Sequence, residues 1–480
     1  MKKFNSNALI ILTSGFLLLG CKNMEISNPI SSVVLPDTYS DMPEVAVDSL
    51  LVWDKFFPDP NLQRLILVAL ANNQDNRRTL EQIRQANAGM VTAKAGLLPQ
   101  VGAMAGASRR KFGEYTMDGV GNFDSNLSEN LPEDKRIPDP YKDFIVGANF
   151  SWEIDVWGKL RSQRKAAIER YLSSVEMSNY VRALLISEIA GQYYLALALD
   201  KEIQILEENI GLQELGVGLV KDLKEGGRAN QLAVDQFEAL VLNSRALMEA
   251  KKRELRSAEL FMNRLSGKVT IDLTRSDLDG VFDAAINQQR SIPAAILQNR
   301  PDIRQAEKEL LATQGDLGAA KASFYPSITL FGLAGFNAFD FSRLFLSPAS
   351  SIYQMGAGLA APVFNRRQIR MAFESAKAGQ QIAMLNYEQK VLDGYLEVLD
   401  LVNQIETYQN QVNLKESEVL VLKQSIENSN TLFSVGYASY LEVITAQSRS
   451  LQTQIELAEL KSAQLKSNAF LYRALGGGWK

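Results

Sequence analysis

Apolar and polar residues alternate along one stretch in the first half of the chain. Apolar side chains stand at every second position from Phe144 to Val156, with mostly polar residues between them. A period of two predicts a β-strand with one apolar face. The period changes after Gly158, and the chain has no proline between Pro140 and Pro293. The chain up to Glu225 is therefore predicted to be one unbroken helix, on the order of 100 Å long.

Weaker alternations predict three more strands. The four predicted strands cover about residues 101–112, 143–156, 327–336 and 352–364. They form two hairpins. A Gly-, Asn-, Asp-, Ser- and Pro-rich segment between Gly113 and Tyr141 predicts a long irregular loop in the first hairpin, and the loop of the second is shorter.

Most of the remaining chain has helical periodicity. Further helices are predicted at about residues 61–72 and 75–98, from Pro301 onward, and at about 368–433 and 439–474. Apolar residues also recur every seven positions in four stretches of the chain, which indicates helices supercoiled side by side. The four series are Ile203, Ile210 and Val217; Val234, Val241, Met248, Leu255 and Met262; Val412, Val419, Ile426 and Phe433; and Ile444, Leu451, Ala458, Leu465 and Tyr472.

The chain repeats itself. An offset of 209 residues aligns Gly227 with Gly436, and an offset of 227 aligns Arg77 with Arg304. The sequence therefore predicts a tandem duplication with the longer hairpin loop in its first half. The predicted organisation is a signal peptide (1–20), an extended arm (21–50), a first repeat (51–267), a linker (268–300) and a second repeat (301–480). The linker contains a short strand-like alternation of Val269, Ile271 and Leu273.

The N-terminus has the features of a secretory signal. Lys2 and Lys3 precede an apolar run from Ala8 to Leu19 that is too short to span a bilayer. The run ends in Leu-Leu-Gly before Cys21, which resembles a bacterial lipobox, in which the cysteine becomes the lipidated N-terminus. Lys22 follows, where an aspartate would indicate inner-membrane retention. We therefore expect lipidation at Cys21 and an outer-membrane destination.

Composition excludes several classes of function. The chain of 480 residues has no histidine, which removes the usual general base and metal ligand and disfavours an enzyme. Cys21 is the only cysteine, so neither an intramolecular disulfide nor a cysteine metal cluster forms. The formal net charge of −4 gives no indication of nucleic-acid binding. No cofactor and no metal site are expected.

Four amphipathic strands have the length of transmembrane strands but do not close a barrel. An open sheet edge in lipid leaves backbone groups unpaired, at a cost of several kcal/mol each. Three copies would supply twelve strands and leave a lumen, whereas two would give a barrel filled by its own side chains. A soluble β-sandwich is the alternative for the same pattern.

Several motifs resemble the outer-membrane factors, the TolC and OprM family. The signature block runs from Asn299 to Glu307 as Asn-Arg-Pro-Asp-Ile-Arg-Gln-Ala-Glu. Further matches are Gly-Ala-Ala-Lys-Ala at 318–322, Phe-Tyr-Pro at 324–326, Phe-Pro-Asp-Pro-Asn-Leu at 57–62, Trp-Glu-Ile-Asp-Val-Trp-Gly at 152–158 and Ser-Tyr-Leu-Glu-Val at 439–443. The resemblance covers essentially the whole chain after Cys21.

The resemblance implies a mixed α and β membrane protein with a TolC-like fold. Each protomer would contribute four transmembrane β-strands and long coiled-coil helices to a homotrimer, whose 12-stranded barrel continues into a periplasmic α-barrel. The lipobox makes the chain most similar to the lipoprotein branch that serves resistance-nodulation-division efflux pumps. The implied partners are a periplasmic adaptor protein, an inner-membrane pump of that type and outer-membrane lipid. Such a duct passively carries drugs or other small molecules outward.

Candidate functional residues fall into four groups. The turns between long helices are expected to contact the adaptor, through Gly226, Gly227, Ala229, Leu232, Gly436 and Ala438. The resemblance places a periplasmic gate at Leu441, Glu442 and Thr445. Lipid is expected to contact Phe150, Trp152, Ile154, Leu359, Ala361 and Val363, and lipidation is expected at Cys21.

The gate residues depart from part of the family. Thr445 stands where a second acid can occur, and Ala233 stands where the first repeat would supply one, so the ring around Glu442 is expected to be weakly acidic and Leu441 to be the main barrier. Glu442 as an ordinary solvated charge is the alternative interpretation. Two other functions stay open: a duct for protein or peptide secretion, and a structural coiled-coil surface lipoprotein.

Overall fold

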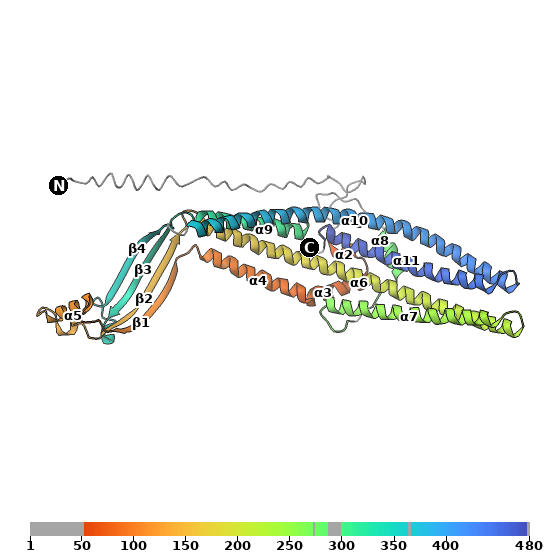
Figure 1. The fold of residues 1–480 in the computed structure, drawn as a ribbon, viewed down its shortest axis with the longest axis horizontal. Helices are drawn as coiled ribbons and strands as arrows, with labels where there is room; N and C mark the ends of the chain where they lie inside the picture. The colour runs from red at the N-terminus through yellow and green to blue at the C-terminus, as the bar shows by residue number, and fades with distance from the viewer. Residues whose placement is uncertain (1–51, 272–273, 287–298, 363–365, 478–480) are drawn as a thin grey trace. The chain divides into compact units, whose positions relative to one another are not determined.

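The computed structural model describes residues 52–271, 274–286, 299–362 and 366–477. They form the following elements: α2 (Trp53–Phe56), α3 (Pro60–Asn72), α4 (Gln74–Ala95), β1 (Gln100–Arg110), α5 (Met117–Leu127), η2 (Glu133–Lys135), β2 (Tyr141–Ile154), α6 (Lys159–Glu225), α7 (Gln231–Leu265), α8 (Leu278–Ile286), α9 (Pro301–Ala322), β3 (Ser327–Ala338), η4 (Phe341–Arg343), β4 (Ser351–Ala360), α10 (Arg366–Ser434) and α11 (Tyr440–Ala474) (Figure 1).

The chain forms two compact units. Among the described residues, the first comprises 87–170, 310–362 and 366–383, and the second comprises 52–86, 171–271, 274–286, 299–309 and 384–477. The first unit holds the four strands and the second holds the helical hairpins α6–α7 and α10–α11. The helices α4, α6, α9 and α10 each contribute residues to both units.

In the first unit the four strands form one antiparallel sheet in the order β1-β2-β3-β4 (Figure 1). All four predicted strands are confirmed, but three of them end earlier than expected, β1 at Arg110 among them. β2 stops at Ile154 and β4 at Ala360, so Ala361 lies beyond the sheet and Val363 lies outside the described residues. The pairing is continuous, from Gln100 opposite Ser151 to Arg110 opposite Tyr141 in the first hairpin.

The long loop between β1 and β2 is not irregular throughout, contrary to the prediction. It contains the helix α5 and the short turn η2. Thr116 caps α5 by accepting a hydrogen bond from the backbone N–H of Gly119 at 3.1 Å. The Gly, Asn and Asp residues of this segment have low helix propensity, so the sequence did not indicate a helix here. The capping threonine was the available signal.

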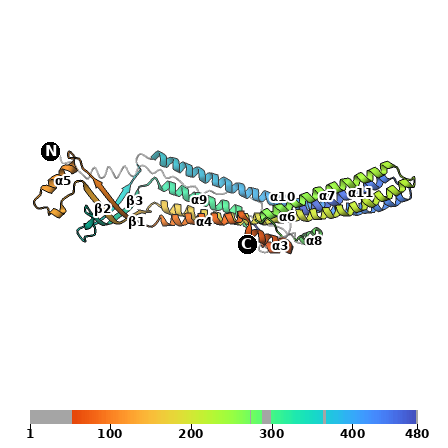
Figure 2. The same ribbon diagram turned by 90° about the horizontal axis from the view of Figure 1, so that it is seen from below.

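The second unit confirms the predicted coiled-coil helices. All residues of the four heptad series are buried or half-buried. Its main core joins α2, α3, α6, α7, α8, α10 and α11, with Tyr193 and Tyr472 as the largest side chains that are almost completely enclosed. Figure 2 shows α6, α7 and α11 running together in this unit. The predicted helix at about 61–72 is also confirmed as α3, whose buried residues Leu62, Leu65, Ile66 and Ala69 form one apolar face.

The linker differs from its prediction. Among the described residues, Val269 and Ile271 are not in a strand, and Leu273 lies outside them. The same segment instead forms α8, whose Leu278 and Phe282 join the main core. Alternation over only three apolar residues does not distinguish a strand from the packed connection that the structure shows.

The duplication is visible in matched contacts. The amide of Asn73 donates from Nδ2 to the carbonyl of Leu265 at 2.7 Å, and the guanidinium of Arg300 donates from Nη1 to the carbonyl of Ala474 at 3.0 Å. These donors are related by the offset of 227 and these acceptors by the offset of 209. In each half, a residue ahead of one helix thus satisfies a free carbonyl at the end of another.

Candidate functional site

One face of the sheet is apolar from edge to edge. Cross-strand pairing places Phe150 beside Val101 and Gly332, and Ile328 beside Leu359. The predicted lipid-contacting residues Phe150, Trp152, Ile154 and Leu359 therefore share this face, and Leu359 is 70% exposed. Its members are Val101, Ala103, Ala105, Ala107, Phe144, Val146, Ala148, Phe150, Trp152, Ile154, Ile328, Leu330, Gly332, Ala334, Phe336, Ala338, Tyr353, Met355, Ala357 and Leu359.

The opposite face is largely polar. The amide of Asn337 donates from Nδ2 to Oδ1 of Asp143 at 2.6 Å on this face. Glycines are frequent here, and Gly147 stands directly opposite Gly335. A Cβ on Gly335 would lie 2.3 Å from the carbonyl oxygen of Val146, so the strands approach closely only because no side chain is present. A sheet with one apolar and one polar face is typical of a barrel wall between lipid and water.

The two helical hairpins of the second unit end in the same kind of turn. Gly227 has φ 71° and Gly436 has φ 83°, as the predicted turns require. The N–H of Arg228 donates to the carbonyl of Leu223 at 2.8 Å, and the N–H of Tyr437 donates to the carbonyl of Leu432 at 2.9 Å. Both are Schellman motifs, one in each repeat.

A shared core holds the two turns together. Val220, Val234 and Phe237 of the first hairpin are buried with Val443 of the second. Ala229 packs against the same core, while Leu232, Gly226 and both turn glycines are exposed and Ala438 is half-buried. The paired turns therefore present a small exposed surface on a fixed base.

The predicted gate residues lie in the first turns of α11. Leu441 is 56% exposed, and Glu442 and Thr445 are also exposed, whereas the single chain buries Val443 and Gln447 of the same helix. Leu441 is therefore free to contact something other than its own chain.

Glu442 is exposed and takes part in a helix cap. Ser439 precedes α11, and its Oγ accepts from the N–H of Leu441 at 3.3 Å and donates to Oε2 of Glu442. This hydrogen bond lowers the pKa of Glu442. Ser-x-x-Glu is a capping box, a signal present in the sequence that the interpretation as a gate overlooked. In the first repeat, the matching helix α7 is capped by Asn230, whose Oδ1 accepts from the N–H of Ala233 at 3.0 Å, and Ala233 stands where a capping box would have its acid.

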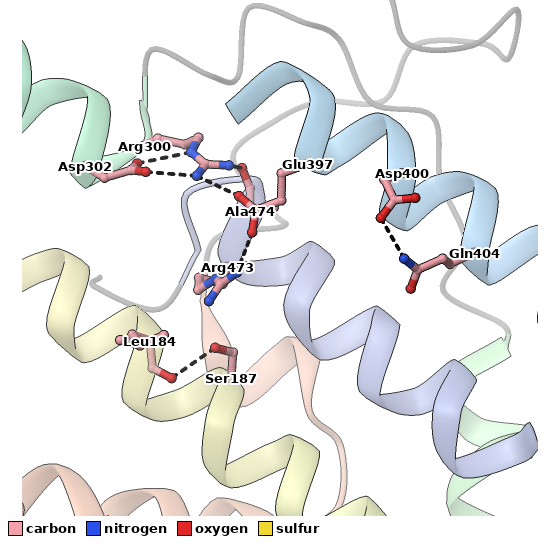
Figure 3. Close-up of polar contacts among 9 residues, drawn as sticks. All are labelled: Leu184, Ser187, Arg300, Asp302, Glu397, Asp400, Gln404, Arg473 and Ala474. Atoms are coloured by element: carbon pink, nitrogen blue, oxygen red, sulfur yellow. Dashed lines mark hydrogen bonds and ion pairs between the residues drawn. The ribbon is translucent and has the colours of Figure 1, made fainter. Parts of the chain in front are cut away.

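The signature block forms a buried ionic network in the second unit (Figure 3). Arg300 is 5% exposed, and its Nη2 lies 2.9 Å from Oδ2 of Asp302 and 2.8 Å from Oε2 of Glu397. Arg473 also pairs with Glu397. Burial pushes the pKa of Asp302 upward, but the hydrogen bonds from Arg300 outweigh it and hold that pKa below its usual value. The block thus ties the start of α9 to α10 and to the end of α11.

The motif at 57–62 takes part in a hydrogen-bond network centred on Asp59. Asp59 caps α3 through the N–H of Asn61 at 2.8 Å and accepts from the hydroxyls of Tyr193 at 2.6 Å and Ser276 at 2.9 Å. Burial raises the pKa of Tyr193 to about 12. Asp59 and Tyr193 are buried in this way within the main core. Sequence reasoning used both motifs only as a resemblance and missed their contacts.

A lysine of α7 links three helices. Nζ of Lys251 lies 2.6 Å from Oε2 of Glu202 in α6 and 3.0 Å from Oε1 of Glu459 in α11. Burial raises the pKa of Glu202 to about 7, although Lys251 opposes this shift.

Within the described ranges, no group of three or more His, Cys, Asp or Glu residues is placed to hold a metal ion. None of the helices in those ranges combines the length and hydropathy needed to cross a bilayer. The predicted lipidation site, Cys21, lies outside the described residues.

Comparison with known proteins decides the family. Residues 65–268 and 292–477 match the family described as outer membrane efflux protein. The chain belongs to this family. This efflux protein is 30% identical over 434 residues to the pyoverdine export outer membrane protein OpmQ of Pseudomonas aeruginosa, covering 89% of this chain and 87% of that one. It is 26% identical over 476 residues to the probable outer membrane lipoprotein SilC of Salmonella typhimurium, covering 98% of each.

Solved structures agree. A solved structure of CusC is 26% identical to this efflux protein, with a TM-score of 0.82 over 95% of this chain and 99% of the other. That structure belongs to work on the conformational changes that accompany folding and transmembrane channel formation of CusC. The outer-membrane channel OprN has a TM-score of 0.81 at 22% identity, over 95% and 98%. The predicted TolC-like fold is confirmed, and so is the prediction of an outer-membrane exit duct for efflux.

Proposed function

We propose that three copies of this efflux protein form the outer-membrane part of a tripartite pump, together with a periplasmic adaptor and an inner-membrane pump of the resistance-nodulation-division type. The observation that carries the proposal is the four-stranded sheet, which has one continuous apolar face and two unpaired edges. Three sheets joined edge to edge supply twelve strands and enclose a lumen. Because four is an even number, β4 of one copy meets β1 of the next in antiparallel order.

The exposed surface of the helices supports assembly. Several large apolar side chains of the second unit are exposed in the single chain, among them Leu212, Leu215, Leu219, Leu242 and Leu260. When many large apolar side chains are exposed on the same part of a protein, another protein surface normally covers them. The predicted membrane contacts of Phe150, Trp152, Ile154 and Leu359 and the predicted anchor at Cys21 belong to the same proposal.

The paired turns are the proposed adaptor contact, six around a trimer. Gly226, Gly227, Ala229, Leu232, Gly436 and Ala438 form or flank them, and the shared core beneath gives them a fixed geometry. The proposed gate follows directly, with three copies of Leu441 as the apolar barrier, three copies of Glu442 as a charged ring, and Thr445 one turn further along the helix. The duct itself does no chemistry, so selection of cargo belongs to the pump.

Single-channel conductance in planar bilayers tests the gate. Leu441→Ala should raise conductance because it removes the apolar barrier, and Glu442→Gln should reduce cation preference because glutamine keeps the capping box while losing the charge. Leu232→Ala, at the matching position of the first repeat, is the control and should leave conductance unchanged. Unchanged conductance and selectivity in both gate variants would place the constriction elsewhere.

Assembly is tested separately. Mass measurement of the detergent-solubilised protein should give three copies, and affinity purification from membranes should recover an adaptor and an inner-membrane pump with it. A monomer that forms conducting channels would contradict the proposed trimer.

A further inference from the structure

Two cations face each other at the loop end of the sheet. Arg109 of β1 is directly opposite Lys142 of β2, and the next pair on the same face is Ala107 with Phe144. Alternation along each strand therefore puts both cations on the apolar face, one step beyond its last apolar pair. Both side chains are exposed.

Like charges directly opposite in a sheet destabilise it unless an anion lies between them. Among the residues that the structure describes, neither cation forms an ion pair with a carboxylate. Asp340 is close enough for Lys142 to affect it, but its Oδ1 accepts from the N–H and the hydroxyl of Ser342 at 3.0 and 2.8 Å. Its Oδ2 lies 3.9 Å from Nε of Arg343. No residue in the described ranges thus supplies an anion dedicated to the pair.

The helix end of the same sheet is arranged differently. Lys159 pairs with Glu153 at 2.6 Å, and Arg161 pairs with Asp155 at 3.1 Å. The contrast shows that this chain places acids beside cations near one end of its strands and leaves Arg109 and Lys142 without them at the other.

Aromatic rings surround the pair's end of the apolar face. Phe144 contacts Phe341 with ring centroids 5.6 Å apart, and Phe336 contacts Phe345 at 5.7 Å. Rings at the border of an apolar band mark the level of lipid headgroups. A cation pair at this level faces headgroup phosphates.

We propose that Arg109 and Lys142 bind a phosphate group of an outer-leaflet lipid of the lipid A type, one site per protomer. The proposal rests on the proposed function, which puts this face in lipid and this end of the sheet on the outside. The planar guanidinium of Arg109 donates two hydrogen bonds to phosphate oxygens, and the ammonium of Lys142 adds a point charge. The phosphate then replaces repulsion across the strand pair with two attractive contacts.

The test measures lipid A binding to the detergent-solubilised full-length assembly by native mass spectrometry. The variant is Arg109→Gln with Lys142→Gln. The control, which removes one cation from the opposite face, is Arg110→Gln, because the adjacent Arg110 points to that face and lies over the ring of Phe112 at 5.8 Å. We expect the double variant to bind bisphosphorylated lipid A about tenfold more weakly or worse, and the control to bind like the unaltered protein. Dephosphorylated lipid A should bind all three proteins equally weakly.

Two further measurements separate the possible failures. Mass and conductance of each variant report on assembly, so a conducting trimer whose lipid A binding is unaffected by the double variant overturns the phosphate site and leaves the duct intact. Equal loss in the Arg110→Gln control also overturns it, because the effect then follows net charge. Displacement of lipid A by equimolar inorganic phosphate would show a free-anion site and would overturn the lipid assignment.

Discussion

The duplication supplies an internal control for the buried network around Arg300. Arg300→Met removes a guanidinium that makes two hydrogen bonds to Asp302, at 3.1 and 2.9 Å, one contact to Glu397 at 2.8 Å and one to the carbonyl of Ala474 at 3.0 Å. Methionine retains most of the apolar volume, so the loss is mainly electrostatic.

The expected loss of folding stability depends on the charges that stay buried after the substitution. Removing one partner of a buried ion pair costs about 3–5 kcal/mol, because the remaining charge has neither water nor a counter-ion. Glu397 keeps Arg473, and Asp302 keeps the N–H of Ile303 at 3.0 Å, which favours the lower end of that range. Asn73→Ala, at the matching position of the first repeat, removes the neutral bond to Leu265 and the 2.9 Å bond to the N–H of Asn76. It should cost about 1–2 kcal/mol.

Denaturant unfolding at equal protein concentration measures both losses, because the apparent stability of an oligomer depends on concentration. Combining Arg300→Met with Asp302→Asn should restore much of the loss, since Asp302 is the acid left without a cation while Glu397 still pairs with Arg473. A loss below about 1 kcal/mol for Arg300→Met, or a double variant less stable than the single one, would refute the reasoning.

Three other outcomes are expected. Burial raises the pKa of Glu202 to about 7, so the unfolded chain releases this proton first and stability falls as pH rises from about 4.5 to about 7. Glu202→Gln should flatten thermal stability over this window, and an unchanged pH profile would contradict it. Gly436→Ala puts a side chain at φ 83° and should cost about 1–2 kcal/mol in thermal unfolding, whereas Gly226→Ala should be nearly neutral. Ala148→Arg, near the middle of β2, should destabilise the trimer by about 2–4 kcal/mol and so lower its yield. Trp152 lies near the strand end, where its indole N–H donates to the carbonyl of Leu97 at 3.0 Å, and Trp152→Arg should cost less. Equal yields would contradict the membrane placement.

Much of the fold could be read from periodicity. The long helices, the four strands and the heptad series were predicted because each repeats one simple period over many residues. Two short helices were not predicted. The helices α5 and α8 have 11 and 9 residues, too few for a period to stand out against glycine and asparagine, and the short alternation from Val269 gave no strand.

The candidate site divides in the same way. The turn glycines and the apolar face were predictable, because a positive φ and an alternating pattern depend on neighbours in sequence. The capping role of Glu442 was visible in the Ser-x-x-Glu spacing, but the sequence analysis considered this residue only as part of a gate or as a solvated charge. The contacts of Asp59 with Tyr193 and of Lys251 with Glu202 and Glu459 had no local signal at all.

By itself, the sequence determined the elements, their duplication and the family resemblance, since these depend on local propensity and on spacing along the chain. Only the tertiary structure decided which distant partners the equivalent residues of the two halves meet. Asn73 and Arg300 occupy equivalent positions and each meets the end of a distant helix, yet only Arg300 finds Glu397 and Asp302 close enough to form a buried network. The physical reason is that ion pairs act over a few ångströms, and such distances between distant segments are fixed by packing.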